Sequence, residues 1–137
     1  MKYHGCILEF TDKRNDELME AFRRVLRNSS FIDIRKVSEE VVNMGCSRFW
    51  VSEERAMVVI NALIKGKNVT DCMSNSKREM FLEIYRRVLS LIDKNDGRSL
   101  FEIVIDVVNS PAPKFYMTPR SAMETIYKIK RGFYDKI

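Results

Sequence analysis

The sequence predicts an all-α protein of about six helices, and three observations lead to this prediction. Apolar residues recur every three or four positions along several stretches, which is the spacing of one helix face. Five glycines and three prolines in 137 residues provide few turns, so a sandwich or barrel of many short strands is disfavoured. The third observation is an internal repeat, which predicts that one helical unit occurs twice.

The repeat is clearest where residues 48–52 are set beside residues 114–118. Both segments read basic, Phe, aromatic, apolar, hydroxyl, at an offset of 66 positions, and the match continues to Gly66 and Gly132. Further upstream, the segment that begins at Phe22 matches the one that begins at Tyr85 at an offset of 63. This shorter offset places three extra residues in the first loop of the second copy.

We therefore expect two trihelical, helix-turn-helix-like units that pack together in one compact domain. The expected boundaries are 1–137 for the domain, 12–66 and 75–132 for the two copies, and 67–74 for the connector.

The first copy carries signals for three helices. A stripe that includes Leu18 and Phe22 predicts a helix over 12–28. Asp33 is placed to cap a second helix over 33–44, which Gly45 ends. The third helix follows Ser52, a good N-cap, and closes at Gly66.

The second copy repeats these signals. Ser76 and Glu79 form the pattern of a capping box at the start of its first helix. The next helix covers 98–109 and stops before Pro111, and Thr118 caps the last helix with Pro119 in the first position. Alternation over residues 6–10, together with the segments 48–51 and 114–117, adds a minor β element to the prediction.

Composition excludes most kinds of chemistry. The chain has one histidine, His4, and three cysteines, Cys6, Cys46 and Cys72, whose spacing lacks the pairs of a zinc site. We expect no catalytic residues, no metal and no cofactor, and therefore a protein that is not an enzyme. An odd number of cysteines without a signal peptide predicts a cytoplasmic protein. Apolar runs of about nine residues are too short to span a membrane.

Positive charge gathers near the end of the sequence. The net charge is +5, and most of this excess lies after residue 113, on the last helix and its flanks. This face is a candidate for binding phosphates, together with the basic residues that precede the two aromatic segments. The candidate nucleic-acid contacts are Arg48, Lys114, Arg120, Lys128, Lys130 and Arg131. The alternative is a solvated polar face with cations near the negative end of a helix.

Trp50 and Tyr116 occupy the same position in the two copies. Each ring follows a basic residue and a phenylalanine, which suits stacking on bases or anchoring a partner protein. The alternative is that both rings pack half-buried against the core, as their polar edges allow.

Three segments, 48–56, 77–85 and 111–119, resemble blocks found in a family of small helical bacterial and phage-associated proteins that has no assigned activity. The resemblance implies a cytoplasmic accessory role linked to a phage or mobile element. It carries over no catalytic residue.

Taken together, these features predict a non-enzymatic nucleic-acid-binding accessory protein. In this prediction the second and third helices of each copy pair as in a helix-turn-helix motif, and the basic face of the last helix contacts phosphates. The alternative is a structural or protein-interaction module, a homo-oligomer or a phage-particle component, that uses Trp50 and Tyr116 as its interface. No membrane association is expected.

Overall fold

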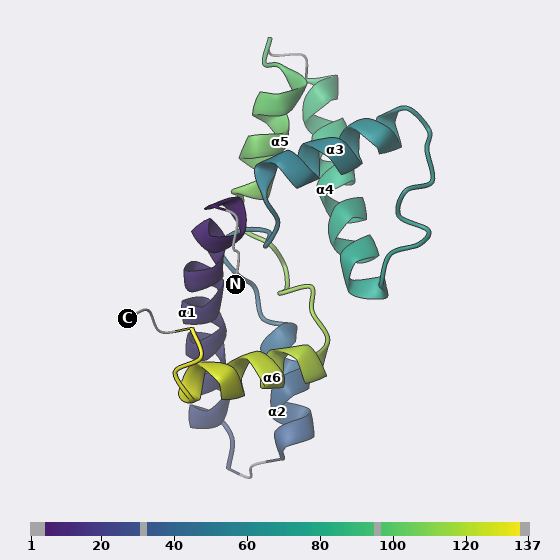
Figure 1. Ribbon diagram of the computed structural model, residues 1–137. Coiled ribbons are helices and arrows are strands. Elements are labelled where there is room, and N and C mark those ends of the chain that lie inside the picture. Colours follow the sequence, from purple (N-terminus) through teal and green to yellow (C-terminus); the bar gives the residue numbers. More distant parts are fainter. Residues whose placement is uncertain (1–4, 31–32, 95–96, 135–137) are drawn as a thin grey trace.

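The computed structural model describes residues 5–30, 33–94 and 97–134, with side chains from residue 10 onward. Over these residues the protein contains helices only, which confirms the all-α prediction and the expected number of helices (Figure 1). Their bounds are α1 Gly5–Arg27, α2 Ile34–Val42, α3 Glu53–Ile64, α4 Asn75–Asp93, α5 Leu100–Val108 and α6 Pro119–Lys130.

Three of the predicted helix starts are confirmed by their capping hydrogen bonds. The side chains of Asp33, Ser52 and Thr118 accept hydrogen bonds from backbone N–H groups in the first turns of α2, α3 and α6. Pro119 is the first residue of α6, as expected. Sequence-local capping signals therefore located half of the helix starts.

The capping box predicted at Ser76 is wrong. α4 begins two residues earlier, because Ser74 has the extended backbone of an N-cap and its side chain accepts from the Lys77 N–H. The capping box of the described chain lies instead at the start of α5, where Ser99 and Glu102 bond each other's backbone N–H groups.

Two further expectations are corrected. Residues 6–10 belong to α1 and form no strand. The loops 28–33 and 94–99 have equal length, so the three extra residues of the second copy lengthen α4 beyond Val88 and do not enlarge a loop. Extending an existing helix satisfies three more backbone N–H groups, which a longer loop would leave to solvent.

The helices pack as two lobes that are not consecutive in sequence. α1, α2 and α6 pack against one another and form the first lobe, and α3, α4 and α5 form the second lobe. Figure 1 shows the first lobe below the second. The third helix of each predicted copy therefore packs with the first two helices of the other predicted copy. The predicted helix-turn-helix pairing of α2 with α3 and of α5 with α6 is wrong, because α2 packs on α6 and α3 packs on α5.

Two linkers, residues 43–52 and 109–118, carry the chain between the lobes and cross each other. Cys46 and Ala112 form an antiparallel β-bridge, with both N–H···O distances at 3.0 Å. The Phe49 N–H donates to the Val108 carbonyl at 2.9 Å, and the Phe115 N–H donates to the Val42 carbonyl at 3.0 Å. Through these bonds, the linker 43–52 passes the end of α5 and the linker 109–118 passes the end of α2. Each linker therefore leads to a helix, α3 or α6, that lies in the opposite lobe. This single bridge takes the place of the expected small sheet.

A close backbone approach occurs at the crossing beside Gly45. A Cβ atom at this position would lie 3.3 Å from the Ala112 carbonyl oxygen, so glycine lets the linkers meet. The connector 67–74, in contrast, joins α3 to α4 inside the second lobe. The Arg78 guanidinium fixes it by donating to the carbonyls of Thr70 and Asp71.

One continuous cluster of buried apolar residues runs through both lobes and the crossing. Many of its members stand at equivalent positions of the predicted copies, such as Ile60 and Ile126, or Phe49 and Phe115. The helices α2 and α5 have equal length at an offset of 66, and so do α3 and α6. These correspondences agree with the internal repeat, whose superposition as a whole stays a prediction.

Candidate nucleic-acid interface

The C-terminal end of α6 carries three cations within one turn. Lys128 and Lys130 lie in its last turn and Arg131 is its C-cap. Gly132, with φ +77°, closes the helix by donating its N–H to the Ile129 carbonyl. A shallow groove of about 590 Å³ opens here. We name this region the α6 basic surface; its lining residues are Glu124, Tyr127, Lys128, Lys130 and Arg131.

The three cations have no ion-pair partner among the residues that the structure describes. Two of them are held by aromatic rings instead. The Lys128 Nζ lies 5.1 Å from the ring centre of Phe133, and the Lys130 Nζ lies 5.0 Å from that of Phe22 on α1. Cation–π contacts orient an ammonium group without cancelling its charge. The surface is therefore positive and ordered at once.

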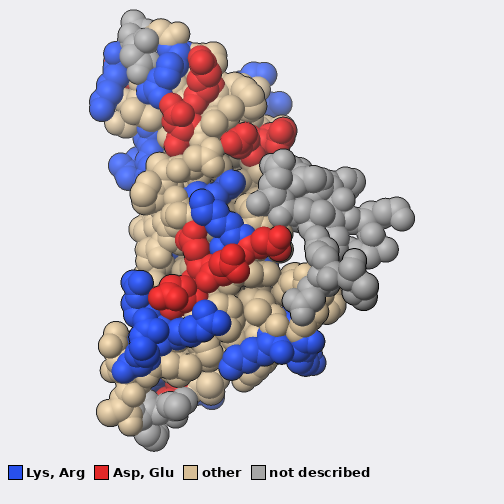
Figure 2. All heavy atoms as spheres, turned by 90° about the vertical axis from the view of Figure 1, so that its left-hand side faces the viewer, with Lys and Arg blue, Asp and Glu red and all other residues tan. Residues whose placement is uncertain are grey.

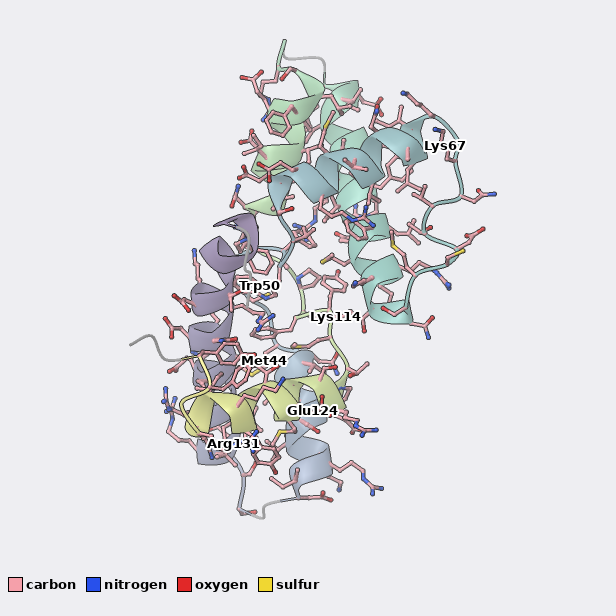
Figure 3. All side chains as sticks on the ribbon, in the orientation of Figure 1. Met44, Trp50, Lys67, Lys114, Glu124 and Arg131 are labelled. Atoms are coloured by element: carbon pink, nitrogen blue, oxygen red, sulfur yellow. The ribbon has the colours of Figure 1, made fainter. Side chains whose placement is uncertain are left out.

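The other three predicted cations already have partners. Arg48 donates to the carbonyls of Phe49 and Val51, at 2.9 and 2.6 Å. Lys114 pairs with Glu79 at 2.9 Å. These two residues lie in the linkers between the lobes, and Figure 3 shows Lys114 well separated from Arg131. The six residues proposed from the sequence thus do not form one surface.

Arg120 differs from both groups. It lies in the first turn of α6 and is 89% exposed, but its Nε is 3.4 Å from the carboxylate of Glu124, one turn further along. An exposed pair of this kind contributes little to stability. It does lower the local positive charge, so Arg120 adds less to anion attraction than the cations at the other end of α6.

Trp50 and Tyr116 lie half-buried where the linkers cross. The Trp50 ring stacks on Phe115 with ring centres 6.3 Å apart, and the Tyr116 ring stacks on Phe49 at 5.9 Å. Each is also approached by the basic residue two positions earlier. These reciprocal contacts correspond to the packing alternative that the sequence left open. Trp50 shows what such packing costs, because its buried Nε1 has no hydrogen-bond partner among the described residues.

Two aromatic residues that the sequence did not single out as binding residues are exposed beside the cations. Tyr127 is 50% exposed and Phe133 is 59% exposed. Tyr127 lies on the solvent-facing side of α6. Its position three residues after Glu124 and four before Arg131 places it on the charged face, and this spacing was the available signal.

Acidic residues lie next to the basic ones on the face drawn in Figure 2. Lys and Arg side chains gather at the height of α6, and a band of Asp and Glu lies above them at the height of the middle of α1. In α1, Glu20 lies 3.8 Å from Arg24 and 3.6 Å from Arg27 and so offsets part of their charge.

The groups with shifted pKa values lie away from this surface. Burial raises the pKa of the Cys46 thiol to about 11, and nearby Glu17 adds to the rise. Burial also raises the pKa of Tyr116 to about 12. A hydrogen bond from Arg86 lowers the pKa of Glu83. Cys46 and Tyr116 belong to the linkers and Glu83 belongs to α4, so none of the three is part of the α6 basic surface.

Within the described part of the chain, no cluster of His, Cys, Asp or Glu has the proximity needed to hold a metal ion. In the same part, no helix is long and apolar enough to cross a bilayer.

Comparison of the chain with family models, with curated proteins and with solved structures gave no match. The resemblance to small phage-associated proteins therefore stays a prediction.

Proposed function

We propose that the protein binds nucleic acid through the α6 basic surface, as a non-enzymatic accessory protein. Lys128, Lys130 and Arg131 contact backbone phosphates. The observation that supports this role is that all three gather on one turn and have no carboxylate partner among the described residues. Unpaired like charges at this spacing repel one another, and a polyanion relieves the repulsion while releasing its own counterions.

A purely structural reason for the three cations is weakened by comparison with α3. Cations near a helix C-terminus are favoured by the helix dipole, so they often have no further role. α3 has the same length as α6 and closes with the same pair of backbone bonds at Gly66. At the positions equivalent to the three cations it carries Ala62, Ile64 and Lys65. The helix end therefore forms without a cluster of cations.

The packing of α6 determines which of its faces is accessible to a ligand. Its buried face, with Ala122, Met123 and Ile126, packs on α1 and α2, and the opposite face is open to solvent. Because α5 is in the other lobe, α6 lacks the preceding helix of a helix-turn-helix reader. The proposal accordingly assigns phosphate contacts to α6 and no groove-reading geometry.

A salt titration tests the proposal. Binding to a mixed pool of short oligonucleotides is measured by fluorescence anisotropy at increasing salt concentration, for the native protein and for the triple variant Lys128→Ala, Lys130→Ala, Arg131→Ala. Each lost phosphate contact lowers the slope of log affinity against log salt by roughly 0.7 to 0.9. We expect the triple variant to lose a slope of about 2 to 3 and most of the affinity.

The matched control removes the same charge from the second lobe. Lys65, Lys67 and Lys77 are exposed and have no ion-pair partner among the described residues. Changing these three to Ala leaves binding nearly unchanged if the α6 basic surface is the site. Equal losses in the two triple variants would show a general charge effect and contradict the proposal, as would absence of binding at low salt.

A protein-interaction module is the second candidate, and a feature of the second lobe favours it. An apolar groove of about 330 Å³ lies where α3, α4 and α5 converge, with Ile64 and Ile92 partly exposed at its edge. This differs from the predicted interface, because Trp50 and Tyr116 are occupied by packing. Sedimentation equilibrium tests it: a homo-oligomer that Ile92→Lys dissociates would support this role.

A further inference from the structure

The exposed aromatic residues bear on which nucleic acid the α6 basic surface takes. Tyr127 lies in the groove between Glu124 and Arg131, and half of its surface is open to solvent. Phe133 lies three residues beyond the end of α6 and is 59% exposed, although Lys128 and Tyr134 both contact it. Lys128 therefore connects the two rings, because it lines the groove with Tyr127 and contacts Phe133. Proteins that bind single strands combine cations with exposed rings in this way.

These two rings are not required by the fold. The aromatic residues at positions 49, 50, 115 and 116 stack on one another at the crossing, and Phe22 and Phe81 are buried in the core. The positions equivalent to Tyr127 and Phe133 are Asn61 in α3 and Lys67 just after it, and α3 closes in the same way as α6. An aromatic residue is therefore unnecessary for structure at either place, which leaves the rings available for a ligand.

Resting on the proposed function, we infer that the α6 basic surface selects single-stranded over double-stranded nucleic acid, with bases stacking on Tyr127 and Phe133. The bases of a duplex are stacked on one another, so these rings reach them only in a single strand. Lys128, Lys130 and Arg131 contact phosphates in either form. The cations supply affinity for any strand, and the rings supply the preference for an unpaired one.

Three ligands of equal length separate the two contributions. They are a single-stranded DNA 12-mer of mixed sequence, the duplex of the same sequence, and a single strand of abasic residues that keeps the phosphates and lacks the bases. Stacking of one base on an aromatic ring corresponds to a factor of roughly 5 to 150 in affinity. We expect the native protein to bind the mixed strand at least tenfold more tightly than the abasic strand or the duplex.

Variants that keep the charge locate this preference. Tyr127→Leu with Phe133→Leu should abolish the tenfold preference and leave duplex affinity unchanged. Phe101→Leu is the control, because Phe101 is an exposed aromatic residue of the second lobe. Circular dichroism checks that each variant keeps its helices.

The outcomes distinguish this inference from the proposed function. Equal binding of the mixed and abasic strands, lost in the triple cation variant, would overturn the stacking inference and leave the phosphate proposal standing. A preference that Phe101→Leu reduces as much as the α6 double variant would also overturn it. Absence of binding to all three ligands at low salt would overturn the proposed function itself.

Discussion

Replacing Ile126 by Ala tests the exchange of helices between the two copies. Ile126 lies on α6 and is 0% exposed. α6 packs against α1 and α2, so the cavity opens in the first lobe, although α4 and α5 are the nearer helices in sequence. The matched variant is Ile60→Ala on α3, which is also 0% exposed and lies in the second lobe.

The magnitude follows from the side-chain atoms removed. Each substitution deletes three carbon atoms, worth about 0.8 kcal/mol each in transfer free energy. The unfilled cavity adds a further loss, which brings the total to about 3 to 4 kcal/mol. If the lobe that holds the cavity opens on its own, its amide hydrogens exchange at least about a hundredfold faster.

Hydrogen exchange followed by mass spectrometry of peptides is the assay. We expect Ile126→Ala to lower the protection of α1 and α2, and Ile60→Ala to lower that of α4 and α5. Loss of protection first in α4 and α5 of the Ile126→Ala variant would refute the exchanged pairing. Equal loss in all six helices in both variants would refute the division into two lobes that open separately.

Two further predictions concern the linker crossing and the helix ends. The raised pKa of Cys46 means that the folded state disfavours the thiolate, so the stabilisation is complete below the unfolded value of 9.0 and is lost as pH rises toward 11. Urea denaturation from pH 8 to 11 should show that the free energy of unfolding falls by up to about 2 kcal/mol, and that the fall is smaller in Cys46→Ala. Identical pH profiles for the native protein and Cys46→Ala would contradict the assignment of this loss to Cys46. Gly66→Ala and Gly132→Ala should each cost about 1 kcal/mol in thermal unfolding because both φ angles are positive, and an unchanged melting temperature would show that the helix ends relax.

Most of the helices could be predicted because the signals that form them are local. A cap such as Ser52 or Thr118 acts on the next three residues, and an apolar stripe reports one face of one helix. The start of α4 was misplaced because Ser74 and Ser76 are both acceptable caps. Which serine caps the helix depends on the backbone conformation at the end of the connector. The identity of either serine does not determine that conformation.

The exchange could not be predicted from these local signals. α3 and α6 have similar buried faces, with Ile60 and Ile126 at equivalent positions. By this pattern, each of the two helices fits the pair α1 and α2 as well as the pair α4 and α5. The choice is made in the linkers, where Phe49 and Phe115 bond to the backbone of the opposite copy's second helix. Ten residues in each linker, more than a helix-turn-helix turn requires, were the sequence signal that the helices of one copy are not adjacent.

Only some of the cations proposed from the sequence belong to the α6 basic surface, again because local signals do not report tertiary contacts. A cluster of basic residues is visible in the sequence, but whether a cation is neutralised depends on neighbours from other elements. Glu79, on α4, neutralises Lys114 of a linker, and backbone carbonyls bind Arg48. Only a tertiary arrangement distinguishes these residues from Lys130, which rests on a ring of α1 and keeps its charge available.

The comparison of α3 with α6 separates what the fold requires from what a ligand requires. The two helices agree in length, in N-cap chemistry and in their closing glycines, and their fully buried isoleucines are equivalent. They differ at the solvent-facing end, where Ile64 borders an apolar groove and Lys130 a basic one. Because the shared features are enough to build either helix, the chemistry of each end is unconstrained by folding. The proposed binding role accounts for the three cations, which have no ion-pair partner among the described residues, and for the exposed rings of Tyr127 and Phe133.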